Sequence, residues 1–194
     1  MLVLASRSAT RLNLLQEAAI EVEAVPSAID ERSVEDALGG ELEPTDLAEI
    51  LAETKAQDVS RRRPGDVVIG ADQVLSLDGE VLHKVDDMEG ARRRLLALQG
   101  RTHTLHTAHV VMRDGAALDR HAETAALTMR PLTPAEVGRA MARDEGALHS
   151  VGCYRLEGPG IRLFERIEGD HTAILGLSML PLLAALRRAG ALDD

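Results

Sequence analysis

Short apolar runs and amphipathic segments alternate along the 194 residues of this chain. Apolar residues at 2–5 predict a short buried strand, and residues 66–77 form the run most typical of a strand. Apolar positions spaced three and four apart predict amphipathic helices between the strands. These helices are expected after residue 8 and over about 44–59, 87–98, 133–143 and 178–189.

Two Asp-Gly pairs, at residues 78–79 and 114–115, mark tight hairpin turns. They predict antiparallel returns at 80–83 and 117–129, the second paired with a strand at 102–112. Further strands are expected at 22–25, 161–167 and 173–175, with a mobile surface segment at 30–43 and a loop at 146–160. Since helices and hairpins interleave, the fold class is a mixed α/β sheet rather than a purely parallel one.

Composition narrows the possible functions. The net charge of −10 disfavours binding to a nucleic-acid polymer, because phosphate contacts along a polymer need a basic face. A small anionic ligand remains compatible with a few cations gathered in one place. No apolar stretch approaches the ~20 residues that span a bilayer, and the first residues lack a signal-peptide pattern. We therefore expect a cytoplasmic protein without a membrane contact.

Only two of the 22 basic residues are lysines, Lys55 and Lys84. A chain that uses arginine almost everywhere could retain lysine where a compact ammonium group is required. Chance is an equally good explanation from composition alone. The two lysines are therefore candidates for a functional site.

Asp72 interrupts an otherwise apolar strand, where an unpaired carboxylate would be costly to bury. Such a residue either serves a site, bound to a metal or a cation, or is a satisfied structural group beside Gly70. The Asp30-Glu31 pair after the second strand could add a metal-binding carboxylate, although acidic pairs at loop entries are more often solvated.

Residues 6–8, Ser-Arg-Ser, stand between a strand and a helix start. Backbone N–H groups and hydroxyls there could cradle an anion, with Arg11 one turn further on. Helix capping by Ser8 is the commoner explanation.

Taken together, these segments resemble the Maf family of nucleotide pyrophosphatases over nearly the whole chain. The ordered motifs that carry the resemblance lie at residues 4–11, 29–31, 52–56, 69–74, 77–84, 98–107 and 169–177. The resemblance implies one domain over residues 1–194, with a twisted sheet, flanking helices and two lobes around a central cleft, as in inosine triphosphatases. It also implies hydrolysis of a nucleoside triphosphate to the monophosphate and pyrophosphate.

The resemblance implies roles for particular residues. Asp72, Glu31, Lys55 and Lys84 would be catalytic, with Glu31 and Asp72 holding a divalent metal ion (Mg, Mn or Co). Ser6 and Arg11, together with the lysines, would contact phosphates. Thr10, Gln73 and Glu157 complete the expected substrate-binding residues.

Gln73 and Glu157 resemble the family branch that acts on 7-methyl-GTP rather than the branch that acts on pyrimidine nucleotides. Glu157 could accept hydrogen bonds from guanine, and its charge would favour a cationic base. Against this assignment, Thr10 stands where that branch carries a large aromatic side chain, and Tyr154 and Phe164 are the only aromatic residues of the chain, so stacking on a cationic base is hard to build. A pyrophosphatase for dTTP or UTP, and a nucleotide-binding regulator of septum formation without turnover, remain the alternatives. The resemblance also implies a homodimer.

Overall fold

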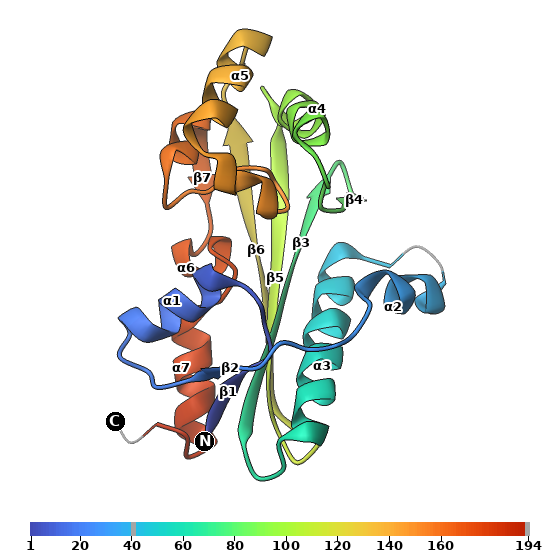
Figure 1. Cartoon of the computed structure of the whole chain (residues 1–194), viewed down its shortest axis with the longest axis vertical. Helices are drawn as coiled ribbons and strands as arrows, with labels where there is room; N and C mark the ends of the chain where they lie inside the picture. The colour runs from blue at the N-terminus through green and yellow to red at the C-terminus, as the bar shows by residue number, and fades with distance from the viewer. Residues whose placement is uncertain (40–41, 193–194) are drawn as a thin grey trace. The chain divides into compact units, whose positions relative to one another are not determined.

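The computed structural model describes residues 1–39 and 42–192, apart from the side chain of His149 (Figure 1). The chain divides into two compact units, and each is built from segments that are not contiguous in sequence. The first unit contains residues 1–73, 106–123 and 170–194, and the second contains residues 74–105 and 124–169.

The strands of the described residues form a mixed sheet in the order β2-β1-β3-β5-β6-β7, and β4 pairs with β3. β1 runs parallel to β2 and to β3, whereas the β3–β4 and β6–β7 pairs are antiparallel. This arrangement confirms the expected mixed α/β sheet. The strands are β1 (Leu2–Leu4), β2 (Glu23–Ala24), β3 (Val67–Leu77), β4 (Glu80–Leu82), β5 (Thr102–Arg113), β6 (Ala116–Met129) and β7 (Phe164–Glu168).

Most helices begin where the sequence carries a capping signal. Thr133 and Glu136 form a reciprocal capping box at the start of α5, and Asp87 accepts a hydrogen bond from the backbone of Gly90 in α4. The helices are α1 (Ala9–Glu17), α2 (Glu31–Leu38), α3 (Pro44–Arg62), α4 (Met88–Leu98), α5 (Pro134–Arg143), α6 (His171–Ile174) and α7 (Met179–Arg188), with 3₁₀ helices η1 (Glu145–His149) and η2 (Pro159–Leu163).

The structure corrects three expectations. The segment at 30–43 contains helix α2, since the Asp30 side chain accepts from the backbone of Arg32 and caps it; Gly40 and Glu41 lie outside the described residues. The expected strand at 173–175 is instead part of α6 and its C-cap, because Asp170 caps that turn through the backbone of Ala173. The loop at 146–160 and the start of the expected strand at 161–167 contain η1 and η2.

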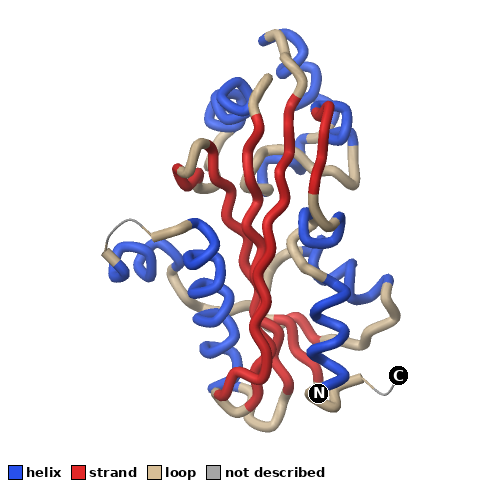
Figure 2. The backbone as a smooth tube through the Cα atoms, turned by 180° about the vertical axis from the view of Figure 1, so that it is seen from behind, coloured by secondary structure: helices blue, strands red, loops and turns tan. Residues whose placement is uncertain are grey.

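The two faces of β3 are covered by different helices of the first unit. Figures 1 and 2 show α3 on one side of the strands and α1 with α7 on the other. Val67, Ile69 and Ala71 belong to the apolar cluster that includes residues of β1, α1 and α7. Because side chains alternate along a strand, Gly70 and Asp72 point to the opposite face, toward α3.

Gly70 allows α3 to lie directly on β3. A Cβ atom at Gly70 would lie 2.1 Å from the carbonyl oxygen of Ala52 and 2.8 Å from the backbone nitrogen of Ala56. Both of these are backbone atoms of α3, so no side chain could move aside to make room. The close approach brings the following residue on this face, Asp72, to the level of Lys55 on the helix.

We expect Gly70→Ala to lower the free energy of unfolding by about 1–3 kcal/mol or more, because the added methyl group forces α3 away from β3. Gly138→Ala is the matched control, since a Cβ at Gly138 in α5 has no atom within 4 Å. Alanine there should be neutral or stabilising by up to roughly 1 kcal/mol. Urea unfolding of both variants measures the difference, and equal stabilities would show that α3 does not pack closely at Gly70.

Two buried histidines of β5 are poorly placed to carry a charge. His109 is 0% exposed, and both its ring nitrogens lack a hydrogen-bond partner among the described residues. Burial and the neighbouring His121 lower its pKa to about 4, against a smaller opposing effect of Asp119. His103 bonds through Nε2 to the Tyr154 hydroxyl at 2.7 Å, and burial, with a contribution from Arg94, lowers its pKa to about 4 as well.

A depressed histidine pKa means that the unfolded chain takes up protons before the folded protein does. Stability is therefore expected to be lost as the pH falls from about 6.5 to about 4, by roughly 2 kcal/mol per histidine at pH 5 relative to neutral pH. Urea unfolding at several pH values tests this expectation. His109→Leu should lose its share of the pH dependence, whereas exposed His171→Gln should behave as the parent; an unchanged profile in His109→Leu would refute the assignment.

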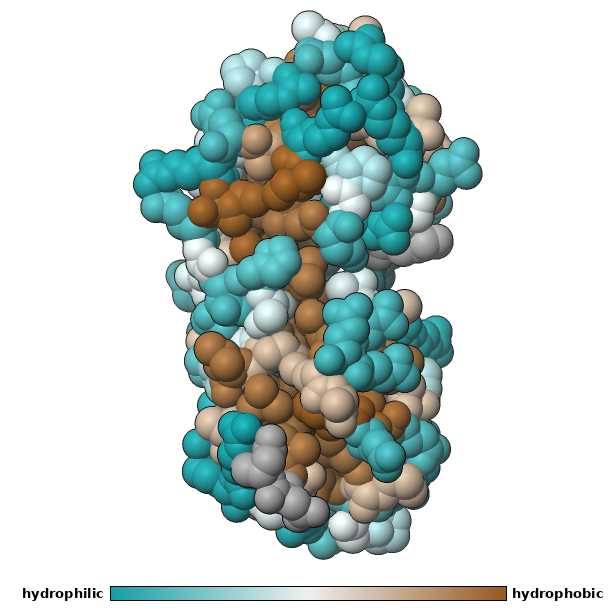
Figure 3. Space-filling model, turned by 90° about the vertical axis from the view of Figure 1, so that its left-hand side faces the viewer, coloured by the Kyte–Doolittle hydropathy of each residue, from teal (hydrophilic) through white to brown (hydrophobic). Residues whose placement is uncertain are grey.

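The surface mixes apolar and hydrophilic side chains on the face shown in Figure 3. Seven large hydrophobic residues among those described are exposed, the most open being Leu180 at 74% and Met1 at 71%. None of the described helices has both the length and the apolar content that crossing a membrane requires.

Candidate active site

A buried ion pair joins helix α3 to strand β3. The ammonium nitrogen of Lys55 lies 2.5 Å from Oδ1 of Asp72, and both residues are buried, at 7% and 6% exposure. The same nitrogen lies 2.7 Å from Oε1 of Glu31, whose side chain is about half exposed. One lysine therefore connects two carboxylates, one buried and one open to solvent.

Local sequence explains why these three residues meet. Asp72 is on the face of β3 that α3 covers, and Lys55 lies between Ala52 and Ala56, the residues that contact Gly70. Glu31 is the first residue of α2, because Asp30 takes the N-cap position. Asp30 therefore caps the helix, and Glu31 forms an ion pair with Lys55.

Arg11 lies beside this cluster and is held by three oxygen atoms. Its Nε donates to the carbonyl oxygen of Gly176 at 2.8 Å, and its Nη1 donates to the carbonyl of Ala71 at 3.0 Å and to Oγ of Ser6 at 3.2 Å. With Nε and Nη1 engaged, Nη2 is the nitrogen that Arg11 can offer to a ligand. Ser6 also accepts from the backbone of Ser8, and Ser8 itself caps α1 through the backbone of Arg11.

The charges of the cluster balance one another. Burial lowers the pKa of the Arg11 guanidinium, and the carboxylates of Asp72 and Glu31 act in the opposite direction. Two cations, Arg11 and Lys55, thus face two anions. A buried carboxylate without such a partner would carry a large desolvation cost.

Gln73 points to the opposite face of β3, where its orientation is fixed. Its amide nitrogen lies 2.9 Å from Oγ1 of Thr107 and 3.0 and 3.1 Å from the carbonyl oxygens of Ala173 and Ile174. Thr107 donates its own hydroxyl proton to Ala173, so its oxygen accepts from Gln73. The amide oxygen of Gln73 is consequently the atom that can accept from a ligand.

The other expected substrate residues lie in both units. Thr10 is half-buried in α1, next to Arg11 in sequence. Lys84 and Glu157 belong to the second unit and are exposed, Lys84 after β4 and Glu157 between η1 and η2. Their membership in the site stays a prediction from the resemblance.

A divalent metal ion would find two suitable ligands here. The described residues contain no group of three or more His, Cys, Asp or Glu side chains placed to hold a metal ion. Magnesium, however, is commonly held by one or two carboxylates together with substrate phosphates and water. The carboxylates of Glu31 and Asp72 meet at one nitrogen and fit this mode of binding.

A distant likeness is found among solved structures. A Ham1 protein of Staphylococcus aureus aligns with a TM-score of 0.40 and 15% identity, over 66% of this chain and 71% of that one. A likeness of this size carries no argument about the site.

Comparison of sequences finds relatives that are about half identical over nearly their full length. A protein of Mesorhizobium japonicum named 7-methyl-GTP pyrophosphatase is 54% identical over 99% of this chain and 98% of its own length. A Brucella abortus protein of the same name is 52% identical over the same shares. A Granulibacter bethesdensis protein named nucleoside triphosphate pyrophosphatase is 46% identical over 98% of each chain. The sequence model of the family described as Maf-like protein matches residues 1–189, and the chain therefore belongs to the Maf family.

Proposed function

We propose that this protein hydrolyses a nucleoside triphosphate at the α-phosphorus, releasing the monophosphate and pyrophosphate. The observation that carries the proposal is the buried Lys55–Asp72 pair, which also binds Glu31 and adjoins Arg11. Relatives that match over nearly their full length are named as pyrophosphatases, which supports the same reaction.

In this reaction, Asp72 orients the attacking water and accepts its proton. General bases contribute when they lie within hydrogen-bond reach of the proton that they remove. Lys55 holds this carboxylate in place at 2.5 Å and offsets its negative charge, which would otherwise repel the triphosphate. Catalysis then rests on a fixed carboxylate within a neutral cluster.

The phosphates would be bound by cations and hydroxyls around this carboxylate. Nη2 of Arg11 and the hydroxyl of Ser6 are the groups of the first unit that can meet phosphate oxygens. Lys84 would add a compact positive charge that follows the oxygens as the bond breaks. A divalent ion (Mg, Mn or Co) held by Glu31 and Asp72 would, when bound, supply further stabilisation of phosphate charge.

We propose 7-methyl-GTP as the substrate. The Mesorhizobium and Brucella relatives carry that name. Guanine presents N1–H and N2–H donors, which need acceptors, and the amide oxygen of Gln73 and the carboxylate of Glu157 are acceptors. The charge of Glu157 would also favour a cationic base, whereas Thr10 would lie beside the base without the stacking contact that an aromatic side chain supplies.

Assays with a nucleotide panel test the proposal. The panel contains 7-methyl-GTP, GTP, dTTP and UTP, each with Mg²⁺, Mn²⁺ or Co²⁺, and chromatography identifies the products. We expect 7-methyl-GTP to be turned over fastest and to yield 7-methyl-GMP and pyrophosphate. Faster turnover of dTTP or UTP would refute the proposed base, a diphosphate as the first product would refute the reaction, and tight binding without product would indicate a regulator.

The homodimer and the cytoplasmic location expected from the sequence remain predictions. Light scattering of the purified chain tests the first, and fractionation of the cells that make it tests the second.

A further inference from the structure

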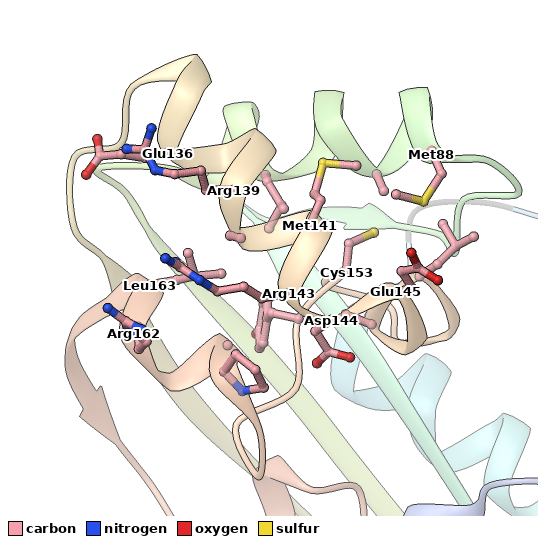
Figure 4. A pocket seen from close by; sticks show the side chains of 18 of the residues that line it. Met88, Glu136, Arg139, Met141, Arg143, Asp144, Glu145, Cys153, Arg162 and Leu163 are labelled. Carbon is pink, nitrogen blue, oxygen red and sulfur yellow. The ribbon is translucent and has the colours of Figure 1, made fainter.

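A cavity of about 200 Å³ lies within the second unit, and none of its lining residues is assigned to the proposed reaction. Its lining comes from α4, α5, η1, η2 and the segments that flank the 3₁₀ helices. Figure 4 shows these elements around it. The proposed function assigns no role to this cavity.

The two sides of the cavity differ chemically. The sulfur atoms of Met88, Met141 and Cys153 lie on one side in Figure 4, and the guanidinium groups of Arg143 and Arg162 point to the other. Leucine and alanine side chains from α4, α5 and η1 complete the apolar part of the lining. Thioethers are polarisable and adapt to apolar ligands of irregular shape.

Arg143 and Arg162 are available to a ligand. Both are exposed, and neither forms an ion pair or a side-chain hydrogen bond with any residue in the part of the chain that the structure describes. Surface arginines in a chain with a net charge of −10 would be expected to find acidic partners. Two such arginines at one end of an apolar cavity therefore represent an uncompensated positive charge.

Two of the three acidic residues of the lining have cationic partners of their own, and the third, Glu145, lies on the side of the sulfur atoms in Figure 4. Asp144 accepts three hydrogen bonds from Arg155, the shortest at 2.6 Å. Glu136 accepts from the backbone N–H of Thr133, from Arg130 and from the Thr133 hydroxyl, and these bonds lower the pKa of its carboxyl to about 2. Both carboxylates thus already have cationic partners.

We propose that this cavity binds a small amphiphilic organic anion, a carboxylate with an apolar body about the size of one aromatic ring. An apolar cavity of roughly 150 Å³ is large enough for benzene, so 200 Å³ accommodates a ring and a short linker. The ring would lie against the methionine side, and the carboxylate would meet Arg143 and Arg162. The binding does not depend on the pyrophosphatase reaction.

The shape of the site favours a small molecule over a protein segment. A helix or a second copy of the chain would need an apolar surface of several hundred Å². Here the apolar residues surround a limited volume, with arginines at one side. Titrations at several protein concentrations separate the two kinds of occupant.

Methionine methyl groups report directly on the cavity. The chain has six methionines, of which Met88 and Met141 line it, whereas Met112, Met129 and Met179 are buried elsewhere. The purified full chain is labelled with ¹³C at the methionine methyls and titrated with 3-phenylpropanoate or with its neutral counterpart, 3-phenylpropan-1-ol. We expect saturable shifts at Met88 and Met141 alone, with tighter binding of the acid than of the alcohol.

Charge variants test the role of the arginines. Arg143→Gln and Arg162→Gln should each weaken binding of the acid by roughly two- to fivefold, as expected for a partly exposed ion pair, and leave the alcohol unchanged. Arg93→Gln is the matched control, because Arg93 is an exposed residue of α4 outside the lining. Since all three side chains are exposed, each variant should fold, and the Met112 and Met179 signals check this.

Several outcomes would overturn the proposal. They are the absence of saturable shifts at millimolar acid, equal affinity for acid and alcohol, and equal weakening by Arg93→Gln. Shifts of Met88 and Met141 that follow protein concentration without added acid would identify a second copy as the occupant. Selective, saturable binding of the acid that depends on Arg143 and Arg162 would support it.

Discussion

Asp72→Asn should lower turnover of the preferred nucleotide by at least ~10²–10⁴-fold while the protein remains folded. Asparagine keeps the shape of the side chain and most of its hydrogen-bonding capacity, but it can neither carry the charge nor take a proton from water. The buried Lys55 ammonium would still have an oxygen acceptor at 2.5 Å and Glu31 at 2.7 Å. The measurement is kcat, with KM determined separately, under saturating nucleotide.

The control for this variant is Asp46→Asn on the exposed surface of α3, which should leave turnover unchanged. A folded Asp72→Asn protein with nearly normal kcat would show that another carboxylate takes the proton. Glu31 would then be the next candidate, since it shares the same lysine.

Lys55→Met is expected to be the most destabilising change in the first unit. Removing one partner of a buried ion pair leaves an uncompensated charge, at a cost of about 3–5 kcal/mol in the free energy of unfolding. Asp72 is only 6% exposed, and Glu31 cannot replace the lysine because it is itself an anion. Urea unfolding measures the loss.

Lys84→Met is a matched control, because Lys84 is the only other lysine and is exposed. Its effect on stability should stay within about 0.5 kcal/mol. The double variant Lys55→Met with Asp72→Asn should regain much of the lost stability, since no buried charge is left unpaired. If the double variant is as unstable as Lys55→Met alone, packing rather than charge explains the effect.

The sequence predicted most elements of the fold because their signals are local. The Asp-Gly turns at 78–79 and 114–115 and the Thr133 capping box determine chain geometry within a few residues. The missed helices, α2 and α6, are short, and their start depends on the aspartate that precedes each one. An aspartate can cap a helix or stay in a loop, and sequence alone does not decide between the two.

The charged residues of the candidate site could be singled out from the sequence, but their contacts with one another could not. Asp72 was conspicuous because a carboxylate in an apolar strand needs a partner, and Lys55 was conspicuous because lysine is rare here. Nothing local indicated that these two residues would pair. Their contact depends on Gly70, whose missing side chain admits α3 to the face of β3.

The sequence did not indicate which residues position Gln73 and Arg11. Thr107 orients the amide of Gln73, and the carbonyl oxygen of Gly176 binds Arg11. Gly176 has φ = 104°, and a Cβ there would lie 3.2 Å from Nε of Arg11. Both residues fall in motifs that carried the family resemblance, which was the available signal, but a supporting role requires knowledge of long-range contacts.

The central claim, attack of water at the α-phosphorus, is tested most directly by turnover in ¹⁸O-labelled water. The proposal predicts that the label appears in the nucleoside monophosphate and that the released pyrophosphate carries none. Mass spectrometry of the two products after a single turnover distinguishes them. Label in the pyrophosphate would place the attack at the β-phosphorus and contradict the mechanism, even with the same two products.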